Sequence, residues 1–232
     1  MILSKAHNFI FLKTTKTAGT SFEIALSKYA GPEDVVTPIS DEDELTRSRL
    51  GYRGPQNYLA PPGLLERVGL RRPRRRFTNH IPAALVRDRL GPEAFDRFYK
   101  VAVVRNPYDV TVSRYYWSHR KQGGTSPEHF RRWLLSRPEI LRKNFNITHI
   151  DGICAADFVM RYERLKDDVA IFAGKVGLPD TLFAEFDALK AKGHYRPKTA
   201  KTSELFDGFD AGKAVVAEIF AHDIVDFGYS CP

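Results

Sequence analysis

Lysine, threonine, glycine and serine follow a short apolar run near the start of the chain, and these residue types can bind an anion. Residues 9–12 read FIFL, and residues 13–21 then read KTTKTAGTS. A strand, a tight polar turn and a helix start direct successive backbone N–H groups at one point, which suits a phosphate-like group. Lys16 adds a mobile positive charge, and the hydroxyls of Thr20 and Ser21 add donors. The segment is therefore a candidate phosphate loop.

The order of residues in this turn differs from that of a Walker A loop. The Walker pattern has Gly-Lys-Ser/Thr in this order, whereas Lys16 comes three residues before Gly19. The hydroxyl after the Walker lysine binds magnesium, and no residue of this turn is placed for that role. A capped helix start, with Glu23 nearby, is the alternative interpretation of the same residues.

A second cationic turn follows the strongest strand signal in the chain. Residues 99–104, YKVAVV, are continuous and rich in valine, as in the central strand of a parallel sheet. Arg105 follows at the carboxyl end, where ligands bind in open α/β sheets, and Ser113 lies two helical turns after Asn106. We expect Arg105 and Ser113 to form a second anion pocket, for a ligand with two separated phosphate-like groups. The alternative is a surface ion pair of Arg105 and a helix face filled by Ser113.

These two segments resemble the sulfotransferases that use 3'-phosphoadenosine 5'-phosphosulfate (PAPS). KTAGTS at 16–21 is similar to their 5'-phosphosulfate loop, and RNPYDVTVSRYY at 105–116 is similar to their 3'-phosphate site. Further similar segments are TNHIPA at 78–83, which resembles carbohydrate-type members, DFVMRYERLKDD at 157–168 and DIVDFGY at 223–229. The resemblance, which includes bacterial members of the family, implies a P-loop-like fold, PAPS as donor and adenosine 3',5'-bisphosphate (PAP) as product.

The resemblance also implies the residues that bind the donor. The 3'-phosphate would lie on Arg105 and Ser113, and a basic loop within 194–204 would cover the donor with Arg196 and Lys198. The residues implied for the 5'-phosphosulfate are Lys16, Thr17, Ala18, Gly19, Thr20 and Ser21. Ala18 stands where family members commonly have glycine, and this difference matters only if the backbone there requires an unusual dihedral angle.

Sulfuryl transfer requires charge stabilisation and a base. It is an in-line displacement at sulfur, in which the protein mainly positions the groups and stabilises charge. We expect Lys16 to meet the negative charge that grows on the bridging oxygen. His80 is the expected base for the acceptor hydroxyl, because an imidazole titrates near neutral pH; a purely structural histidine is the alternative. This chemistry requires no metal, and the sequence shows no cluster of metal ligands.

The order of the elements predicts an α/β fold in a single domain, 1–232, with a parallel sheet covered by helices on both faces. Predicted strands are 8–12, 77–80, 99–104 and 157–162, and predicted helices are 21–29, 107–117, 163–176, 211–222 and two that begin at Pro82 and Pro127. Residues 31–75 are rich in proline, glycine and charge. We expect them to form an irregular insertion, either an acceptor site or a mobile lid, that ends in an arginine run at 71–76.

Composition limits the classes of protein that fit. The net charge of +8 favours anionic partners, and no apolar run is long enough to span a bilayer. The start of the chain lacks a secretory pattern, and Cys154 and Cys231 lack metal-ligand spacing. We therefore expect a soluble protein of the reducing cytoplasm.

The most favoured function is transfer of a sulfuryl group from PAPS to a hydroxyl of a carbohydrate or glycolipid. A P-loop kinase or other phosphotransferase is the first alternative, and it would require magnesium and ATP. A non-catalytic polyanion-binding protein, based on the net charge and the arginine run, is the second. Basic and aromatic residues do not alternate as they do on a base-stacking surface, so we expect no nucleic acid as partner.

Overall fold

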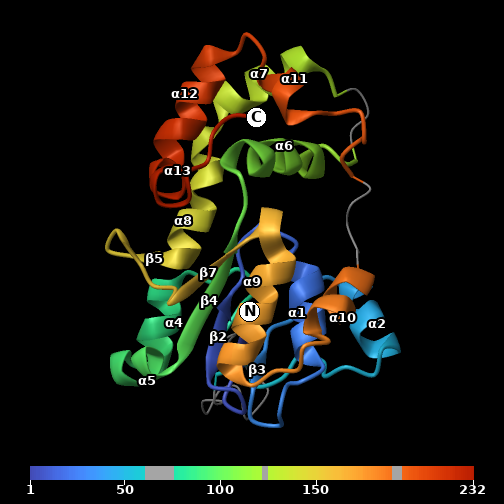
Figure 1. The fold of residues 1–232 in the computed structure, drawn as a ribbon, viewed down its shortest axis with the longest axis vertical. Helices are drawn as coiled ribbons and strands as arrows, with labels where there is room; N and C mark the ends of the chain where they lie inside the picture. The colour runs from blue at the N-terminus through green and yellow to red at the C-terminus, as the bar shows by residue number, and fades with distance from the viewer. Residues whose placement is uncertain (61–75, 122–124, 190–194) are drawn as a thin grey trace, which may run out of the picture.

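The computed structural model describes residues 1–60, 76–121, 125–189 and 195–232 of the 232-residue chain. Its main feature is a five-stranded sheet with the strand order β3-β1-β2-β4-β7, and a two-stranded hairpin, β5-β6, lies apart from it (Figure 1). The strands are β1 (Ile2–Ser4), β2 (Phe9–Leu12), β3 (Val35–Val36), β4 (Tyr99–Val104), β5 (His149–Ile150), β6 (Ile153–Cys154) and β7 (Phe158–Arg161).

Helices cover the sheet and also lie beyond its carboxyl edge (Figure 1). In the described ranges they are α1 (Gly19–Ser27), α2 (Asp41–Arg49), α4 (Ala83–Leu90), α5 (Pro92–Arg97), α6 (Pro107–Ser118), α7 (Pro127–Ser136), α8 (Lys143–Thr148), α9 (Leu165–Val176), α10 (Leu182–Ala188), α11 (Thr202–Phe206), α12 (Asp210–Ile219) and α13 (Ala221–Phe227), with 3-10 turns at Pro138–Arg142 and Tyr162–Arg164.

Three parallel strands form the centre of the sheet. β4 pairs in parallel with both β2 and β7, so YKVAVV is the central parallel strand that the sequence predicts. β1 pairs antiparallel with β2 and with β3. The sheet is therefore mixed, and the prediction of a parallel sheet is correct for its centre and wrong for this edge. β1 escaped prediction because three residues show too little periodicity.

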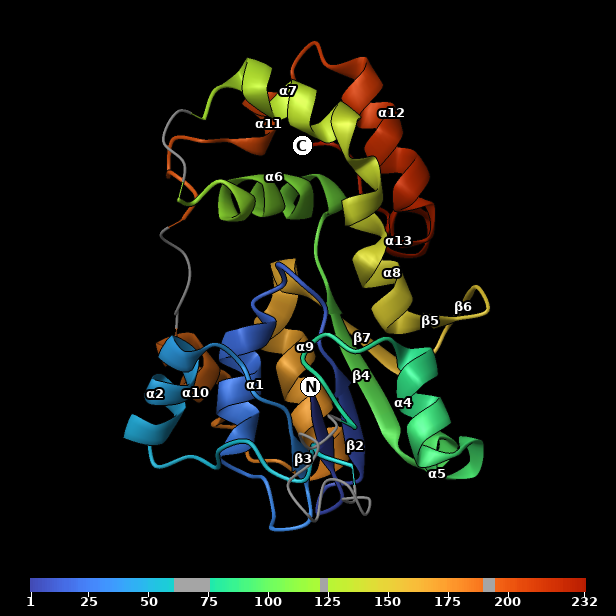
Figure 2. The ribbon, with the colours of Figure 1, turned by 180° about the vertical axis from the view of Figure 1, so that it is seen from behind.

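Both faces of β2 are buried, which explains its continuous apolar sequence. Phe9 and Phe11 belong to a core cluster that includes side chains of α1, α9 and α10. Ile10 and Leu12 belong to a second cluster, with side chains of α4, α5 and α8 on the opposite face (Figure 2). Two helical layers thus hold the strands, so that the carboxyl ends of β2 and β4 are fixed side by side.

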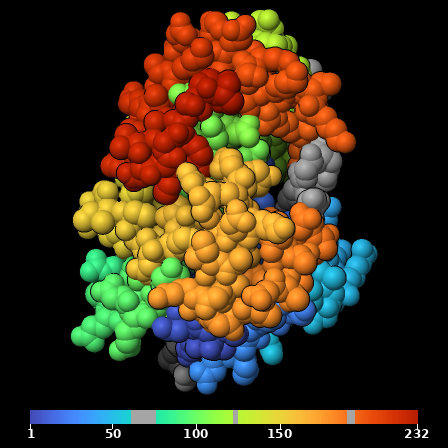
Figure 3. Space-filling model, viewed as in Figure 1, coloured from blue at the N-terminus to red at the C-terminus, as the bar shows by residue number. Residues whose placement is uncertain are grey.

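α6 lies across the carboxyl edge of the sheet (Figure 1). Its start is as predicted, because Pro107 is its first residue and the Asn106 side chain accepts a hydrogen bond from the Tyr108 amide at 3.0 Å. A third core cluster packs α6 against α7, α11 and α12. In the space-filling view, residues of α6 are set back between the C-terminal helices and α9 (Figure 3).

Two predicted elements differ from the structure. Residues 77–80 do not form the predicted strand: a bend at 77 is followed by a turn at 79–80, where His80 has a φ of 59°, which a strand does not allow. The predicted helix 211–222 falls in two helices, α12 and α13, which meet at Phe220 with a φ of −107° and a ψ of 27°.

Residues 31–60 are the part of the segment 31–75 that the structure describes. Its described residues, up to 60, include β3 on the edge of the sheet and α2 against α1, so an irregular conformation is not the rule there. Arginines 71–75 of the predicted run lie outside the described residues.

Candidate functional site

The loop after β2 is anchored to the neighbouring strand by threonine side chains. Thr14 Oγ1 donates a hydrogen bond to the Val103 carbonyl of β4 at 2.5 Å, and it lies 2.8 Å from Thr17 Oγ1. Both threonines are buried. The Thr17 hydroxyl, which the resemblance assigns to the donor, therefore bonds within the loop, where it fixes the backbone.

The backbone of this loop has the form of an anion-binding nest. Lys16 has a φ of 67° and Ala18 a φ of 59°, with Thr17 between them outside the left-handed region. Alternation of this kind turns successive N–H groups toward one point. α1 begins directly after Ala18, and no side chain caps its first amides. The positive end of the helix dipole and the nest therefore face the same place.

Ala18 has the backbone requirement that makes its difference from glycine matter. A left-handed conformation costs an L residue about 1–2 kcal/mol. We predict that Ala18→Gly raises the free energy of unfolding by about 0.5–1 kcal/mol, because part of that gain is offset by the entropy of glycine in the unfolded chain. Urea denaturation measures this change. The control is Ala25→Gly inside α1, which should lose about 1 kcal/mol or more, and a loss for Ala18→Gly as well would contradict the prediction.

Gly19 is required by a close approach. A β-carbon at this position would lie 3.0 Å from Lys13 Cγ and 3.2 Å from the Thr14 carbonyl oxygen. The Lys13 side chain therefore passes directly beneath the first residue of α1. Sequence reasoning treated Gly19 as part of the phosphate loop; the structure adds that a side chain at this position would crowd Lys13 and the Thr14 carbonyl.

Arg105 joins the two predicted anion sites. Its Nη1 donates to the Lys16 carbonyl at 3.4 Å, and its Nη2 forms an ion pair with Asp109 at 3.0 Å. The guanidinium also lies 4.2 Å from the centre of the Tyr162 ring. Its Nε is buried and has no hydrogen-bond partner among the described residues. A buried donor without an acceptor is unfavourable, so this nitrogen is an unsatisfied donor at the sheet edge.

Asp109 connects Arg105 to the predicted basic loop. Arg196 Nη1 lies 3.0 Å from Asp109 Oδ1, and the Thr202 hydroxyl donates to the same oxygen. Burial tends to raise the pKa of Asp109, but the hydrogen bond from Thr202 and the charge of Arg105 outweigh it and lower this pKa. Asp109 is thus an anion that holds two arginines together.

The other residues predicted to bind the donor do not all lie near Arg105. Lys16 Nζ lies 5.4 Å from the centre of the Trp117 ring, and half-buried Ser113 lies one helical turn after Asp109, on the side of Arg105. The Ser21 hydroxyl donates to the Leu189 carbonyl at 3.0 Å. Lys198 is exposed and is not brought into the arginine cluster, and Thr20 is half-buried at the start of α1.

His80 lies at the start of the loop. Its Nδ1 is 2.9 Å from the Lys13 carbonyl oxygen. Because a carbonyl only accepts, Nδ1 carries the proton and Nε2 keeps its lone pair. Burial, and then the charge of Lys13, lower the pKa of His80 to about 3. The expectation of titration near neutral pH is therefore wrong for this state of the protein, in which His80 is a neutral imidazole.

The low pKa of His80 has a consequence for stability. The native pKa of about 3 lies below the unfolded value of 6.5, so at pH 5 the unfolded chain binds a proton that the native protein does not. The contribution of the neutral, buried His80 to the free energy of unfolding is present above pH 6.5 and is lost as the pH falls toward 3. We predict that the free energy of unfolding falls by up to about 2 kcal/mol from pH 7 to pH 5 because of this histidine. Urea denaturation at both values should show a smaller loss for His80→Asn, and equal losses would contradict the assignment.

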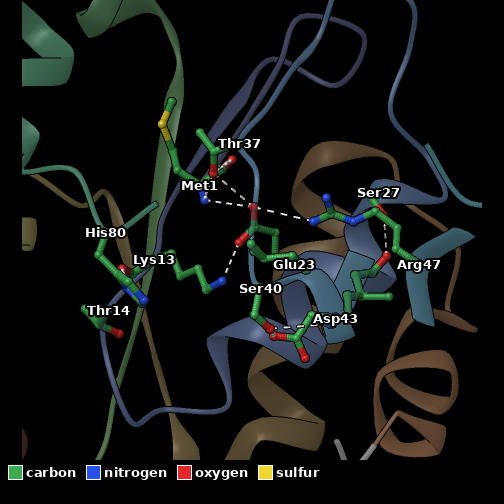
Figure 4. Close-up of polar contacts among 12 residues, drawn as sticks. Met1, Lys13, Thr14, Glu23, Ser27, Thr37, Ser40, Asp43, Arg47 and His80 are labelled. Atoms are coloured by element: carbon green, nitrogen blue, oxygen red, sulfur yellow. Dashed lines mark hydrogen bonds and ion pairs between the residues drawn. The ribbon is translucent and has the colours of Figure 1, made fainter. Parts of the chain in front are cut away.

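A buried ion cluster lies behind the loop (Figure 4). Lys13 Nζ is 2.6 Å from Glu23 Oε2, Arg47 Nη2 is 3.6 Å from Glu23 Oε1, and the Met1 amino nitrogen is 3.0 Å from that same oxygen. Arg47 also pairs with Glu44 at 3.0 Å. Burial alone would raise the pKa of Glu23, but the surrounding positive charges, Lys13 first, lower it to about 2. The cluster fastens β1, β2, α1 and α2 to one another.

A second group of polar contacts holds the outer side of the loop. Asn144 of α8 accepts from the amide and the hydroxyl of Thr15, at 2.8 and 2.7 Å, and donates to its carbonyl at 3.0 Å. Arg114 Nη2 donates to the Thr15 hydroxyl at 2.5 Å. Sequence reasoning missed both residues, because their link to Thr15 spans about a hundred residues of chain and has no local signal.

Two surface cavities do not include the loop after β2 in their lining. One of about 510 Å³ is bordered by Lys28, Arg53 and Gln56, and one of about 410 Å³ is bordered by Phe206, Lys213 and Cys231. In the described ranges, His, Cys, Asp and Glu side chains do not gather in groups of three or more that could hold a metal ion. None of the described helices is both long and apolar enough to cross a membrane.

Comparison with known proteins gives one relative. No protein-family model and no solved structure matches this chain. The chain is 32% identical over 106 residues to an uncharacterized protein of Archaeoglobus fulgidus, and the match covers 44% of this chain and 87% of that protein. At this identity and coverage, the chain belongs to the same family as the Archaeoglobus protein. Because that relative is uncharacterized, it supplies no activity.

Proposed function

We propose that this protein is a sulfotransferase that moves a sulfuryl group from PAPS to a hydroxyl of a carbohydrate or glycolipid. The observation that carries the proposal is the pair of anion-binding turns at one sheet edge, joined by the hydrogen bond from Arg105 to the Lys16 carbonyl. A nucleotide with one anionic group on each side of its ribose matches two such turns. The resemblance of both segments to the sulfotransferase family supports this, and a P-loop-like fold is part of the proposal.

The residues present fit the donor. The uncapped start of α1 and the nest at Lys16 to Ala18 offer backbone donors for the 5'-phosphosulfate. The buried Arg105 Nε, which lacks an acceptor among the described residues, offers a donor for the 3'-phosphate, beside Ser113 and Arg196. When bound, PAPS supplies the sulfuryl group: the S–O bond to PAP breaks, and a new S–O bond to the acceptor oxygen forms.

Two side chains of the chain supply the remaining chemistry. His80 is fixed by the Lys13 carbonyl in the tautomer with Nε2 free, and Nε2 accepts the proton of the acceptor hydroxyl. Lys16 stabilises the charge that develops on the leaving oxygen. The low pKa of His80 means that its base form persists over the whole neutral range, and transfer should therefore show no loss of rate near pH 6.5.

The cytoplasm is the compartment that we propose for this reaction. Both cysteines are free thiols, Cys154 exposed and Cys231 half-buried, which supports a reducing environment.

The test is transfer of radioactive sulfate from labelled PAPS to a set of neutral and acidic sugar glycosides, with and without a chelator. We expect labelled product in both conditions. The control is the same reaction with ATP labelled in its γ-phosphate and magnesium, which tests the phosphotransferase alternative. Transfer of phosphate in that control, together with no transfer from PAPS, would contradict the proposal.

A further inference from the structure

Arg114 is a buried cation without a carboxylate partner in the part of the chain that the structure describes. It lies on α6 next to Ser113, and its exposed fraction is 8%. Its one hydrogen bond within the described ranges is the bond to the Thr15 hydroxyl, and no described carboxylate lies within 4.0 Å. Desolvation, without an opposing charge, lowers the pKa of this guanidinium. Among the described residues, the charge of Arg114 therefore has no counter-charge.

Arg47 is a buried arginine of this protein that has carboxylate partners. That side chain is fully buried, but it lies 3.6 Å from Glu23 and 3.0 Å from Glu44. A buried charge is costly unless a counter-charge accompanies it. Arg114 differs from Arg47 in this respect, and it lies beside the anion loop. Its counter-charge is therefore expected to arrive with a ligand.

The residues around Arg114 indicate which part of a ligand would bind it. Arg114 and Asn144 both bind Thr15, and Lys143 precedes Asn144 at the start of α8. Lys143 is exposed; desolvation and then the nearby charge of Arg114 lower its pKa. Lys143 also contributes, after burial and Lys13, to the low pKa of His80. Lys143 thus interacts electrostatically with both Arg114 and His80.

The surroundings of Arg114 are distinct from the 3'-phosphate cluster. Arg105 and Arg196 are joined through Asp109. Arg114 is bound to Thr15, the residue two positions after the one whose carbonyl holds His80. An anion on Arg114 would therefore lie beside Thr15, two residues along the loop from the carbonyl that holds His80.

We propose that Arg114 and Lys143 form a subsite for an acidic group of the acceptor, so that the substrate is an anionic hydroxyl compound. The acidic group is a carboxylate, sulfate or phosphate close to the hydroxyl that gives its proton to His80. A guanidinium suits all three, because its planar N–H groups bind two oxygens at once. This inference rests on the proposed sulfotransferase function.

The test uses protein saturated with PAP and pairs of probes that differ only in charge. The carboxylate pair is 4-nitrophenyl β-D-glucuronide and 4-nitrophenyl β-D-glucoside, and the phosphate pair is glucose 6-phosphate and glucose. Calorimetry should show that the wild type binds at least one acidic probe about tenfold or more tightly than its neutral partner, as one charge-assisted pair implies. In Arg114→Gln that preference should fall to about one, while PAP affinity stays within about twofold.

Two further variants make the result decisive. Lys143→Gln changes an exposed residue, so it should fold normally, and it should reduce the preference about threefold. Arg132→Gln removes an exposed arginine of α7 and should leave the preference unchanged. If Arg114→Gln does not fold, the test is the loss of preference for the acidic probe in Lys143→Gln.

Other outcomes overturn the subsite. A wild type that binds PAP but does not prefer either acidic probe, or a preference that survives both variants, contradicts it and leaves the sulfotransferase proposal intact. A loss of PAPS affinity without loss of PAP affinity in Arg114→Gln would assign this arginine to the sulfuryl group of the donor instead. Failure of the wild type to bind PAP would contradict the proposed function itself, and the subsite would fall with it.

Discussion

Replacing Arg105 by alanine is expected to weaken the binding of PAP by about 100-fold, because truncating one partner of a buried, hydrogen-bonded charge pair costs about 2–5 kcal/mol. The guanidinium lies between the Tyr162 ring, Asp109 and the Lys16 carbonyl, and its Nε faces no acceptor among the described residues. Those contacts hold the guanidinium in one orientation, so that the 3'-phosphate of the proposed donor would meet a hydrogen-bond donor already in place. The measurement is calorimetric titration with PAP in the absence of metal.

Matched variants separate this effect from a change in net charge. Arg164→Ala removes an arginine that pairs with Asp168 at 2.9 Å and is half exposed, so PAP affinity should change less than threefold. Arg105→Lys keeps the charge but loses the fork, and an intermediate loss of about tenfold is expected. Unaltered PAP affinity in Arg105→Ala, with the fold intact by circular dichroism, would show that this residue does not bind the donor.

Replacing Glu23 by glutamine is expected to lower the free energy of unfolding by about 3–5 kcal/mol, because it leaves buried cations without their counter-charge. The Lys13 side chain is 1% exposed and that of Glu23 is fully buried, with 2.6 Å between nitrogen and oxygen. Without Glu23, Lys13 must either stay charged in the core or lose its proton at neutral pH. Urea denaturation at pH 7 gives the change directly.

The control for Glu23 is a second carboxylate of the same cluster. Glu44→Gln removes a partner of Arg47 at 3.0 Å, but that carboxylate is 23% exposed, so the loss should stay at about 1 kcal/mol. Acid titration adds a second readout. The pKa of Glu23 is lowered to about 2, so its contribution is present above its unfolded value of 4.5 and is lost as the pH falls toward 2. A Glu23→Gln variant as stable as the wild type would contradict this account of the cluster.

Local signals in the sequence predicted the elements that present the site. The valine-rich strand at 99–104, the helix that begins at 107 and the position of Arg105 at a strand end follow from neighbouring residues, and the structure has them as predicted. The strand 157–162 and the end of the next helix at Gly177, with a φ of 68°, are also confirmed. These features depend on contacts within a few residues, which a single sequence displays.

The features of the site that the sequence did not predict depend on contacts between distant segments. Arg196 was predicted on resemblance alone, and its link to Arg105 through Asp109 exists only once residues 87 positions apart meet. Lys13 begins a polar segment, where a lysine is expected to be exposed. Its side chain nevertheless enters the core, because Glu23 offers a counter-charge there. Likewise, burial and the Lys13 charge set the pKa of His80. A sequence shows the charge of each residue but not which charges the fold brings together.

The central claim is that two anion-binding turns act together on one nucleotide. It is tested most directly by calorimetry with PAP, with ATP and 5'-AMP as comparisons, all without added metal. We expect PAP to bind at least about tenfold more tightly than either comparison nucleotide, because it alone has a phosphate for each turn. Equal affinities for the three nucleotides, or no binding of PAP, would contradict the claim.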